Sequence, residues 1–236
     1  GDNAVYDIAE GQTLSVLDSH RTLSVAASLT GAGTFEVNGG SLTVTVPDEA
    51  SGNPALGGDL AAMAVRFATL DLTPDMTLST ALTLQDATLT GTGTLTTTGE
   101  TTLSGYNTLR DAVWNNAGTL TLDADAELLF EDTQPLEGPD TTPTLNNLAP
   151  GEASVEGGQI TVNSTAWAPI LRDLLVEGGQ GVLNNAGVID WDGNSSVNDA
   201  NDNFYSQIVG VALNNSGTLN INSGANLVLN QNSGTH

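Results

Sequence analysis

Residues 87–104 read ATLTGTGTLTTTGETTLS, and a closely similar stretch, ASLTGAGTFEVNGGSLT, occurs earlier at residues 27–43. When the two are aligned, apolar residues fall on apolar residues and glycines fall on glycines. A repeat within one chain has to be interpreted first, because it marks architectures that stack copies of one structural unit.

A second phrase recurs further along the chain. It reads WNNAGTLTL at residues 114–122, LNNAGVIDW at 183–191 and LNNSGTLNI at 213–221, and its NSGT core returns at 232–235. The end of each phrase alternates apolar and polar residues, which is typical of a strand with one buried face. Asparagine and glycine precede it, and both tolerate the positive φ angles of sharp corners.

Short strands with one apolar face are marginally stable alone and have to stack on further copies. Leucines at equivalent places and repeated corners therefore predict an all-β coil whose parallel strands lie about 4.8 Å apart. The specific prediction is a right-handed parallel β-helix, or β-solenoid, with loop and short-helix insertions. The alternative is an antiparallel β-sandwich, which also has many short strands but does not require a repeated corner. The positions expected to stack are Gly118, Gly187 and Gly217 at the corner and Leu120, Ile189 and Leu219 inside.

The chain of 236 residues is long enough for one core, and we expect a single domain over residues 1–236. Both ends look cut from a longer exported protein. Breaks in the strand pattern predict insertions near residues 47–75, 131–157, 164–180 and 192–210. Apolar residues at helical spacing predict a short helix within residues 165–176, and Asp59 is a candidate cap for another short helix or the start of an irregular turn.

The charge balance excludes several classes of partner. The chain has 28 acidic residues against 4 arginines, no lysine and no cysteine, and its net charge is −24. Such a chain repels nucleic acid and anionic membrane surfaces. Disulfides, thiol catalysis and lysine Schiff bases are excluded by composition. No run of residues is long and apolar enough to predict insertion into a membrane.

One stretch, DWDGNSSVNDANDN at residues 190–203, resembles a calcium-binding loop. Asp190, Asp192 and Asn194 place oxygen ligands at alternate positions, as the first half of such a loop does. Ser195 stands where an EF-hand needs glycine and Asn201 where it needs glutamate, so the prediction is a looser calcium site that includes Asp199 or Asp202. The other interpretation is a solvated polar turn.

Catalysis has little support in the sequence. Only His20 and His236 are histidines, and no serine lies in a nucleophile-elbow motif. With so many carboxylates, some pair will have glycosidase-like separation by chance. We therefore predict that the chain is not an enzyme. The alternatives are a carbohydrate-active β-helix enzyme and a calcium-dependent glycan-binding module, for which exposed tryptophans would be needed; the candidates are Trp114, Trp167 and Trp191.

The two repeated phrases resemble those of bacterial surface adhesins of β-helical type, namely autotransporter passengers and filamentous-haemagglutinin-like exoproteins. The resemblance implies a non-enzymatic structural or adhesive segment that is extracellular or attached to the bacterial surface. It also implies partners on a host or neighbouring cell, either glycan or protein. The sequence leaves the oligomeric state open.

Overall fold

The fold is described by a computed structural model for residues 5–24, 28–45, 60–123, 126–133, 142–163, 170–173, 181–192, 206–222, 224–225 and 227–230. All regular secondary structure in these ranges is β-strand. Every pairing between described strands is parallel. The all-β prediction is confirmed, and the parallel pairing excludes the antiparallel β-sandwich.

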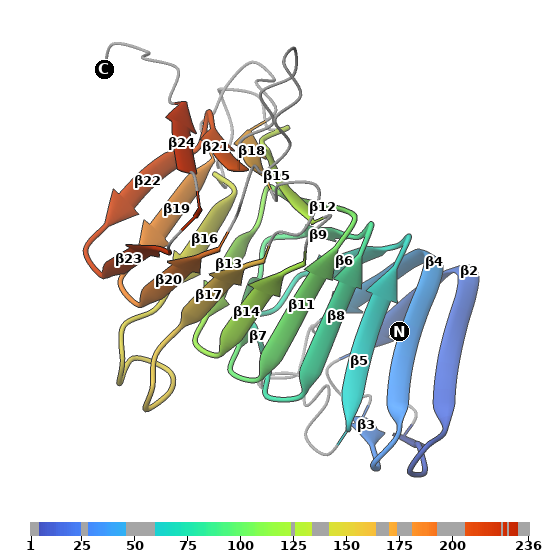
Figure 1. The fold of residues 1–236 in the computed structure, drawn as a ribbon. Helices are drawn as coiled ribbons and strands as arrows, with labels where there is room; N and C mark the ends of the chain where they lie inside the picture. Colours follow the sequence, from blue (N-terminus) through green and yellow to red (C-terminus); the bar gives the residue numbers. More distant parts are fainter. Residues whose placement is uncertain are drawn as a thin grey trace.

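Most strands belong to three stacks, and neighbours in a stack come from different turns of the chain (Figure 1). Stack 1 consists of β7 (Met76–Leu78), β10 (Thr94–Thr97), β13 (Val113–Asn116), β16 (Thr144–Asn147), β19 (Val182–Asn185) and β22 (Ala212–Asn215).

Stack 2 consists of β5 (Ala62–Arg66), β8 (Ala81–Gln85), β11 (Glu100–Ser104), β14 (Thr119–Leu122), β17 (Gln159–Val162), β20 (Val188–Trp191) and β23 (Thr218–Ile221). Stack 3 consists of β6 (Thr69–Leu72), β9 (Thr88–Thr90), β12 (Tyr106–Arg110), β15 (Glu127–Glu131), β18 (Ile170–Asp173), β21 (Ser206–Val209) and β24 (Leu227–Asn230). From β7 to β24 the chain visits stacks 1, 2 and 3 in strict rotation.

Longer strands begin the molecule. The first half of β4 (Thr34–Thr45) pairs with β5 and its second half with β6, so β4 joins stacks 2 and 3. The edge strand β2 (Thr13–Ser24) pairs along β4 (Figure 1). The remaining strands, β1 (Val5–Asp7) and β3 (Ser28–Thr30), pair with each other.

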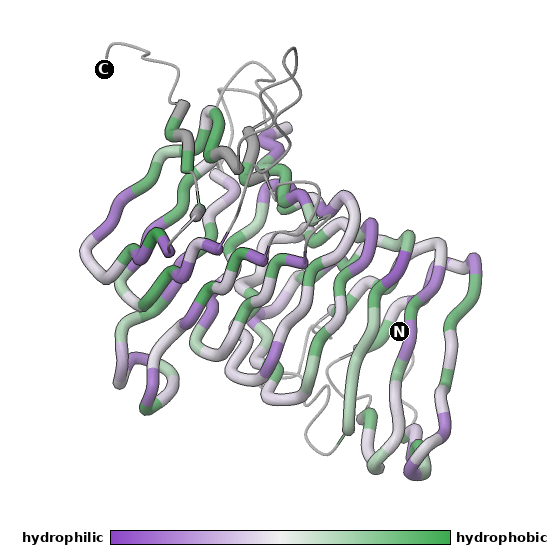
Figure 2. The backbone as a smooth tube through the Cα atoms, in the orientation of Figure 1, coloured by the Kyte–Doolittle hydropathy of each residue, from purple (hydrophilic) through white to green (hydrophobic). Residues whose placement is uncertain are grey.

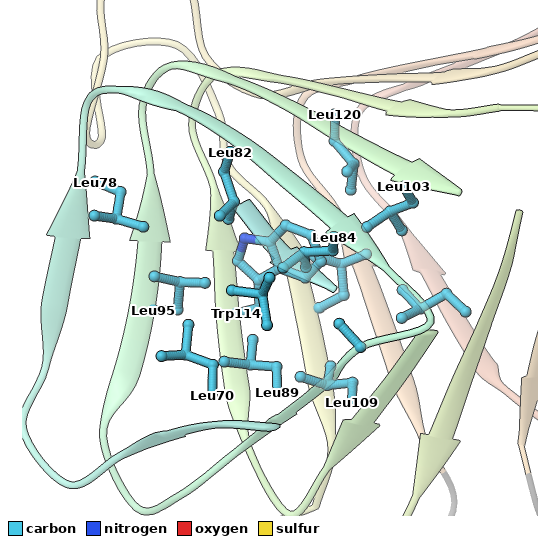
Figure 3. Close-up of a cluster of buried hydrophobic side chains, with 14 of the residues drawn as sticks. Leu70, Leu78, Leu82, Leu84, Leu89, Leu95, Leu103, Leu109, Trp114 and Leu120 are labelled. Carbon is cyan, nitrogen blue, oxygen red and sulfur yellow. The ribbon is translucent and has the colours of Figure 1, made fainter. Parts of the chain in front are cut away.

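The core lies between the three stacks. Strands alternate buried and partly exposed residues, so hydrophobic and hydrophilic positions alternate along most turns (Figure 2). Leucines from all three stacks meet around the buried Trp114 (Figure 3). Parallel strands place equivalent side chains directly above one another, so each leucine packs on its counterpart in the next turn.

The predicted stacking of the second phrase is confirmed. Leu120 pairs through Ile160 with Ile189, and Ile189 pairs with Leu219. The corner glycines also lie in one column. A Cβ on Gly187 would lie 2.1 Å from the carbonyl oxygen of Gly158, and one on Gly217 would lie 2.2 Å from that of Gly187. Only glycine permits this approach between successive corners.

The first repeat stacks differently from the second. Phe35 lies in β4 and pairs with Met63 of stack 2, whereas the aligned Leu95 lies in stack 1 and pairs with Trp114. Both copies share a local turn, since Gly31 and Gly91 have φ angles of 95° and 115°. The sequence similarity therefore reflects a shared corner conformation and not a shared position in the stacks.

Strands occupy the segment predicted as a helix and the segment for which a short helix or an irregular turn was considered. Residues 170–173 form β18 inside the helix predicted at 165–176, and residues 62–66 after Asp59 form β5. Leu171 of β18 and Met63 and Val65 of β5 are buried in the core, and pairing with neighbouring strands overrides the local preference at these places. No described segment is a helix long and apolar enough to cross a membrane.

The ranges predicted to hold insertions also contain strands. Strands β5 and β6 lie within 47–75, β16 within 131–157, β18 within 164–180 and β21 within 192–210. Asp59 and Trp167 lie in these ranges but outside the described residues, as do the predictions made for them.

A buried hydroxyl gives a testable stability prediction. Thr101 is 1% exposed, lies between Leu82 and Leu120 in the inward column of stack 2, and its Oγ1 makes no hydrogen bond to described atoms. We expect Thr101→Val to raise the free energy of unfolding by about 1 kcal/mol, because a lone buried hydroxyl carries a desolvation penalty. Urea unfolding measures the change, and Thr102→Val on the outer side of the same strand is the neutral control. A loss of stability in Thr101→Val would contradict this explanation.

Candidate functional site

The corner between stacks 1 and 2 is held by a ladder of buried asparagines. Asn116 donates to the Oδ1 of Asn147 (2.9 Å), Asn147 to that of Asn185 (2.7 Å), and Asn185 to that of Asn215 (2.7 Å). Each also donates to a backbone carbonyl at the start of the adjacent stack 2 strand. The amide groups of these asparagines bond to one another and to the backbone. We therefore infer that the second asparagine of the repeated phrase has a structural role.

A second ladder runs on the outer side of the same strands. Asn146 donates to Asn115, Asn184 to Asn146 and Asn214 to Asn184, at 2.8 to 2.9 Å. The donors in this ladder point toward the N-terminal turns, opposite to those of the inner ladder. The Asn-Asn pair thus forms hydrogen bonds to both neighbouring turns. Its first asparagine lies on the outer side of stack 1, where the amides form an uncharged surface.

One corner of this column is expanded into a loop. Residues 148–158 separate β16 from β17, whereas only Ala117 and Gly118 separate β13 from β14. The loop is fastened at its base, because Gly158 N donates to Leu148 O (2.8 Å). Within it, Glu152 accepts from the amide of Ala149 (3.1 Å) and the Ser154 hydroxyl donates to the carbonyl of Ala117 (2.5 Å). The loop therefore has a defined shape and projects beside β17 (Figure 1).

A cleft of about 520 Å³ lies between this loop and the neighbouring corners. Glu100 and Glu156 supply carboxylates to its lining, Thr119 and Ser154 supply hydroxyls, and Gln159 supplies an amide. No basic side chain is among its described lining residues. These groups can hydrogen-bond a neutral or cationic ligand, and the carboxylates disfavour an anionic one.

The predicted calcium residues divide into two groups. Asp190 lies on the outer side of β20, where it accepts hydrogen bonds from Gln159 (2.9 Å) and Asn220 (2.7 Å). Asp192 accepts one from Asn222 in the next turn (2.5 Å). The predictions for Asn194 and Asp199 lie outside the described residues, and the described residues contain no group of three His, Cys, Asp or Glu suited to a metal.

The other sequence candidates are placed as follows. His20 lies on the edge strand β2, where its Nδ1 is 2.7 Å from the hydroxyl of Ser41. Trp114 and Trp191 are each 1% exposed, so neither can form the aromatic surface considered for a glycan module. Both occupy inward positions of their strands, where their size fills the core.

Sequence reasoning missed two features. It assigned residues 131–157 to one insertion, although Leu145-Asn146-Asn147 repeats the start of the second phrase and forms part of β16. The loop at 148–158 interrupts the phrase before its glycine, which is Gly158. It also missed that Phe67 and Tyr106 are exposed, because the exposure of a corner residue depends on how the neighbouring turns pack.

Comparison of this chain with family models, with curated proteins and with solved structures found no match.

Proposed function

We propose that this chain is a non-enzymatic structural and adhesive segment of a bacterial cell-surface or secreted adhesin, built as a right-handed parallel β-helix. The observation that carries the proposal is the rotation of strands through three continuous parallel stacks. Parallel strands joined in this order are connected by right-handed crossovers in nearly all proteins. The repeated phrases, which resemble those of surface adhesins, support the same conclusion.

A rigid segment of this kind suits display at a distance from a cell. The column from β2 to β23 contains nine strands, which at about 4.8 Å each gives a height on the order of 40 Å. Asparagine ladders and backbone hydrogen bonds join each turn to the next. The loop at 148–158 and its cleft lie on the outside of this scaffold, where binding residues are commonly found.

Adhesion is tested with beads that carry the purified chain. The number of beads retained on epithelial cells and on bacterial cells under flow is compared with beads carrying an inert protein of similar net charge. We expect greater retention and its loss when soluble chain is added as competitor. Retention equal to the inert protein on both surfaces would refute the adhesive role. A variant in which Ala-Gly replaces residues 148–158 shows whether the cleft contributes.

We propose calcium as a ligand of this segment because Asp190 and Asp192 lie on the same side of β20 and its end, beside the asparagines of the next turn. A cation bound only by the folded chain is expected to stabilise it by roughly 2.7 kcal/mol at a hundredfold excess over its Kd. The measurement is a thermal melt in calcium and in sodium of matched ionic strength, which reproduces screening without coordination. Asp190→Asn/Asp192→Asn should lose the calcium-specific gain; an equal gain in both proteins would rule the site out.

A further inference from the structure

Two exposed aromatic side chains lie at the corner between stacks 2 and 3. Phe67 is 59% exposed and Tyr106 is 73% exposed. By contrast, Phe35, Phe130, Trp114 and Trp191 are at most 2% exposed. In a chain with 4% aromatic residues, the exposure of two rings on one corner is a feature that core packing does not explain.

The register places both residues at the same corner, two turns apart. Thr69 of β6 pairs with Thr88 of β9, and Thr88 pairs with Thr108 of β12. Two residues before these threonines stand Phe67, Asp86 and Tyr106. The backbone N–H of Tyr106 donates to the Oδ1 of Asp86 (2.9 Å), which ties the two positions together. The backbone positions of Phe67 and Tyr106 are thus two turns apart, about 10 Å, with Asp86 in the turn between them.

The backbone at this corner is unusual for an aromatic residue. Phe67 has a φ of 51°, and the described non-glycine residues that share a positive φ are Asp18, Asp86 and Asp111. Aspartate tolerates the left-handed conformation, whereas a bulky apolar residue does so at a cost in free energy. In the turn of Tyr106 the positive φ, 64°, is taken by Gly105 instead. Strain of this kind is typical of functional positions.

A column of threonine hydroxyl groups adjoins the two aromatic residues. Thr69, Thr88 and Thr108 form the next outward column of stack 3, and each is partly exposed. Beyond them, Arg110 forms an ion pair with Glu131 (Nε–Oε2 2.6 Å), so its charge is compensated. The surface therefore combines two aromatic rings, hydroxyl groups and carboxylates.

We propose that this corner, defined as Phe67, Asp86, Tyr106 and the threonines Thr69, Thr88 and Thr108, binds an extended, uncharged polysaccharide. The inference rests on the proposed adhesive function and names its ligand class. Aromatic rings stack on the apolar faces of sugar rings, and two turns of the coil, about 10 Å, correspond to a disaccharide repeat in an extended chain. Asp86 and the threonine hydroxyls face the sugar hydroxyl groups as hydrogen-bonding partners. A net charge of −24 disfavours an acidic polysaccharide, and two separated rings are too small a patch for a protein partner.

Affinity electrophoresis tests the ligand class. Native gels contain hydroxyethylcellulose, xylan, galactomannan or no polymer, with carboxymethylcellulose and chitosan as the anionic and cationic counterparts. We expect at least one uncharged polymer to retard the chain and carboxymethylcellulose not to. Retardation by no uncharged polymer, or by a charged polymer alone, would overturn the proposal.

Variants test the corner itself. Phe67→Asn and Tyr106→Asn should each weaken retardation at least threefold, and the double variant should abolish it. Asparagine tolerates positive φ, so Phe67→Asn should unfold at an equal or higher urea concentration than the original chain, which separates lost binding from lost folding. Val5→Asn, at a residue 69% exposed on β1 and away from both the corner and the cleft, is the control and should leave retardation unchanged. Undiminished retardation of the double variant would place the glycan site elsewhere. If beads with the double variant still adhere to cells, this inference fails while the adhesive function stands.

Discussion

Replacing Leu120 with alanine is expected to lower the free energy of unfolding by about 2–5 kcal/mol, the range for deleting a large buried side chain. Leu120 is fully buried in the core (Figure 3). The strand register places it in a column between Thr101 and Ile160. Because the strands above and below are held by parallel hydrogen bonds, the stack cannot collapse into the cavity. Urea unfolding followed by far-ultraviolet circular dichroism measures the loss.

The matched control for this variant is Thr121→Ala on the same strand. Thr121 is on the outer side of β14, and an exposed substitution usually changes stability by less than about 0.5 kcal/mol. Equal losses in the two variants would show that the inward face is misassigned. In a repeat array the effect of Leu120→Ala can stay local, so hydrogen exchange of β11, β14 and β17 locates the loosened turns.

Asn147→Leu is expected to cost about 2–6 kcal/mol, because it leaves one buried acceptor and one buried donor unpaired at about 1–3 kcal/mol each. The acceptor is the Oδ1 of Asn185, 2.7 Å from the Asn147 amide, and the donor is the Asn116 amide, 2.9 Å from the Asn147 Oδ1; the Val188 carbonyl loses a further hydrogen bond. Leucine is similar in size, so the loss reports hydrogen bonding and not volume. The free energy of unfolding in urea is again the measurement.

Asn146→Leu is the control for the inner ladder. Asn146 belongs to the outer ladder and is only partly buried, so water can replace its hydrogen bonds. We expect a change below about 1 kcal/mol. If Asn146→Leu proved as costly as Asn147→Leu, the two ladders would be energetically equivalent and burial would not explain the role of the inner one.

The structure of the recurring phrase could be predicted from the sequence, because each of its residues suits a local backbone conformation or a buried or exposed position. Asparagine and glycine suit the corner, and alternating Leu and Thr suit a strand with one buried face. The repeat at 27–43 and 87–104 did not predict which strands lie next to each other. Its Gly-x-Gly turns are alike, but the following strands join different stacks, and local sequence carries no record of the partner strand.

In the candidate sites too, single residues could be identified from the sequence, whereas their contacts could not. Asp190 and Asp192 could be picked out as oxygen ligands, but their hydrogen bonds to Asn220 and Asn222 come from residues 30 positions away. The cleft beside Glu100 exists because residues 148–158 fold back over Ala117, a contact made between turns. Phe67 and Tyr106 are 39 residues apart. They share a corner only because the chain returns to the same corner in each turn of the coil.

By itself, the sequence determined the all-β class, the positions of the corner glycines and the inward leucines of the repeated phrase, since these follow from backbone freedom and side-chain alternation. Only the tertiary structure decided which strands pair, that residues 62–66 and 170–173 are strands, and which aromatics face solvent. The physical reason is that strand hydrogen bonds and burial are made with other turns of the chain, so their free energy depends on neighbours that no local pattern specifies.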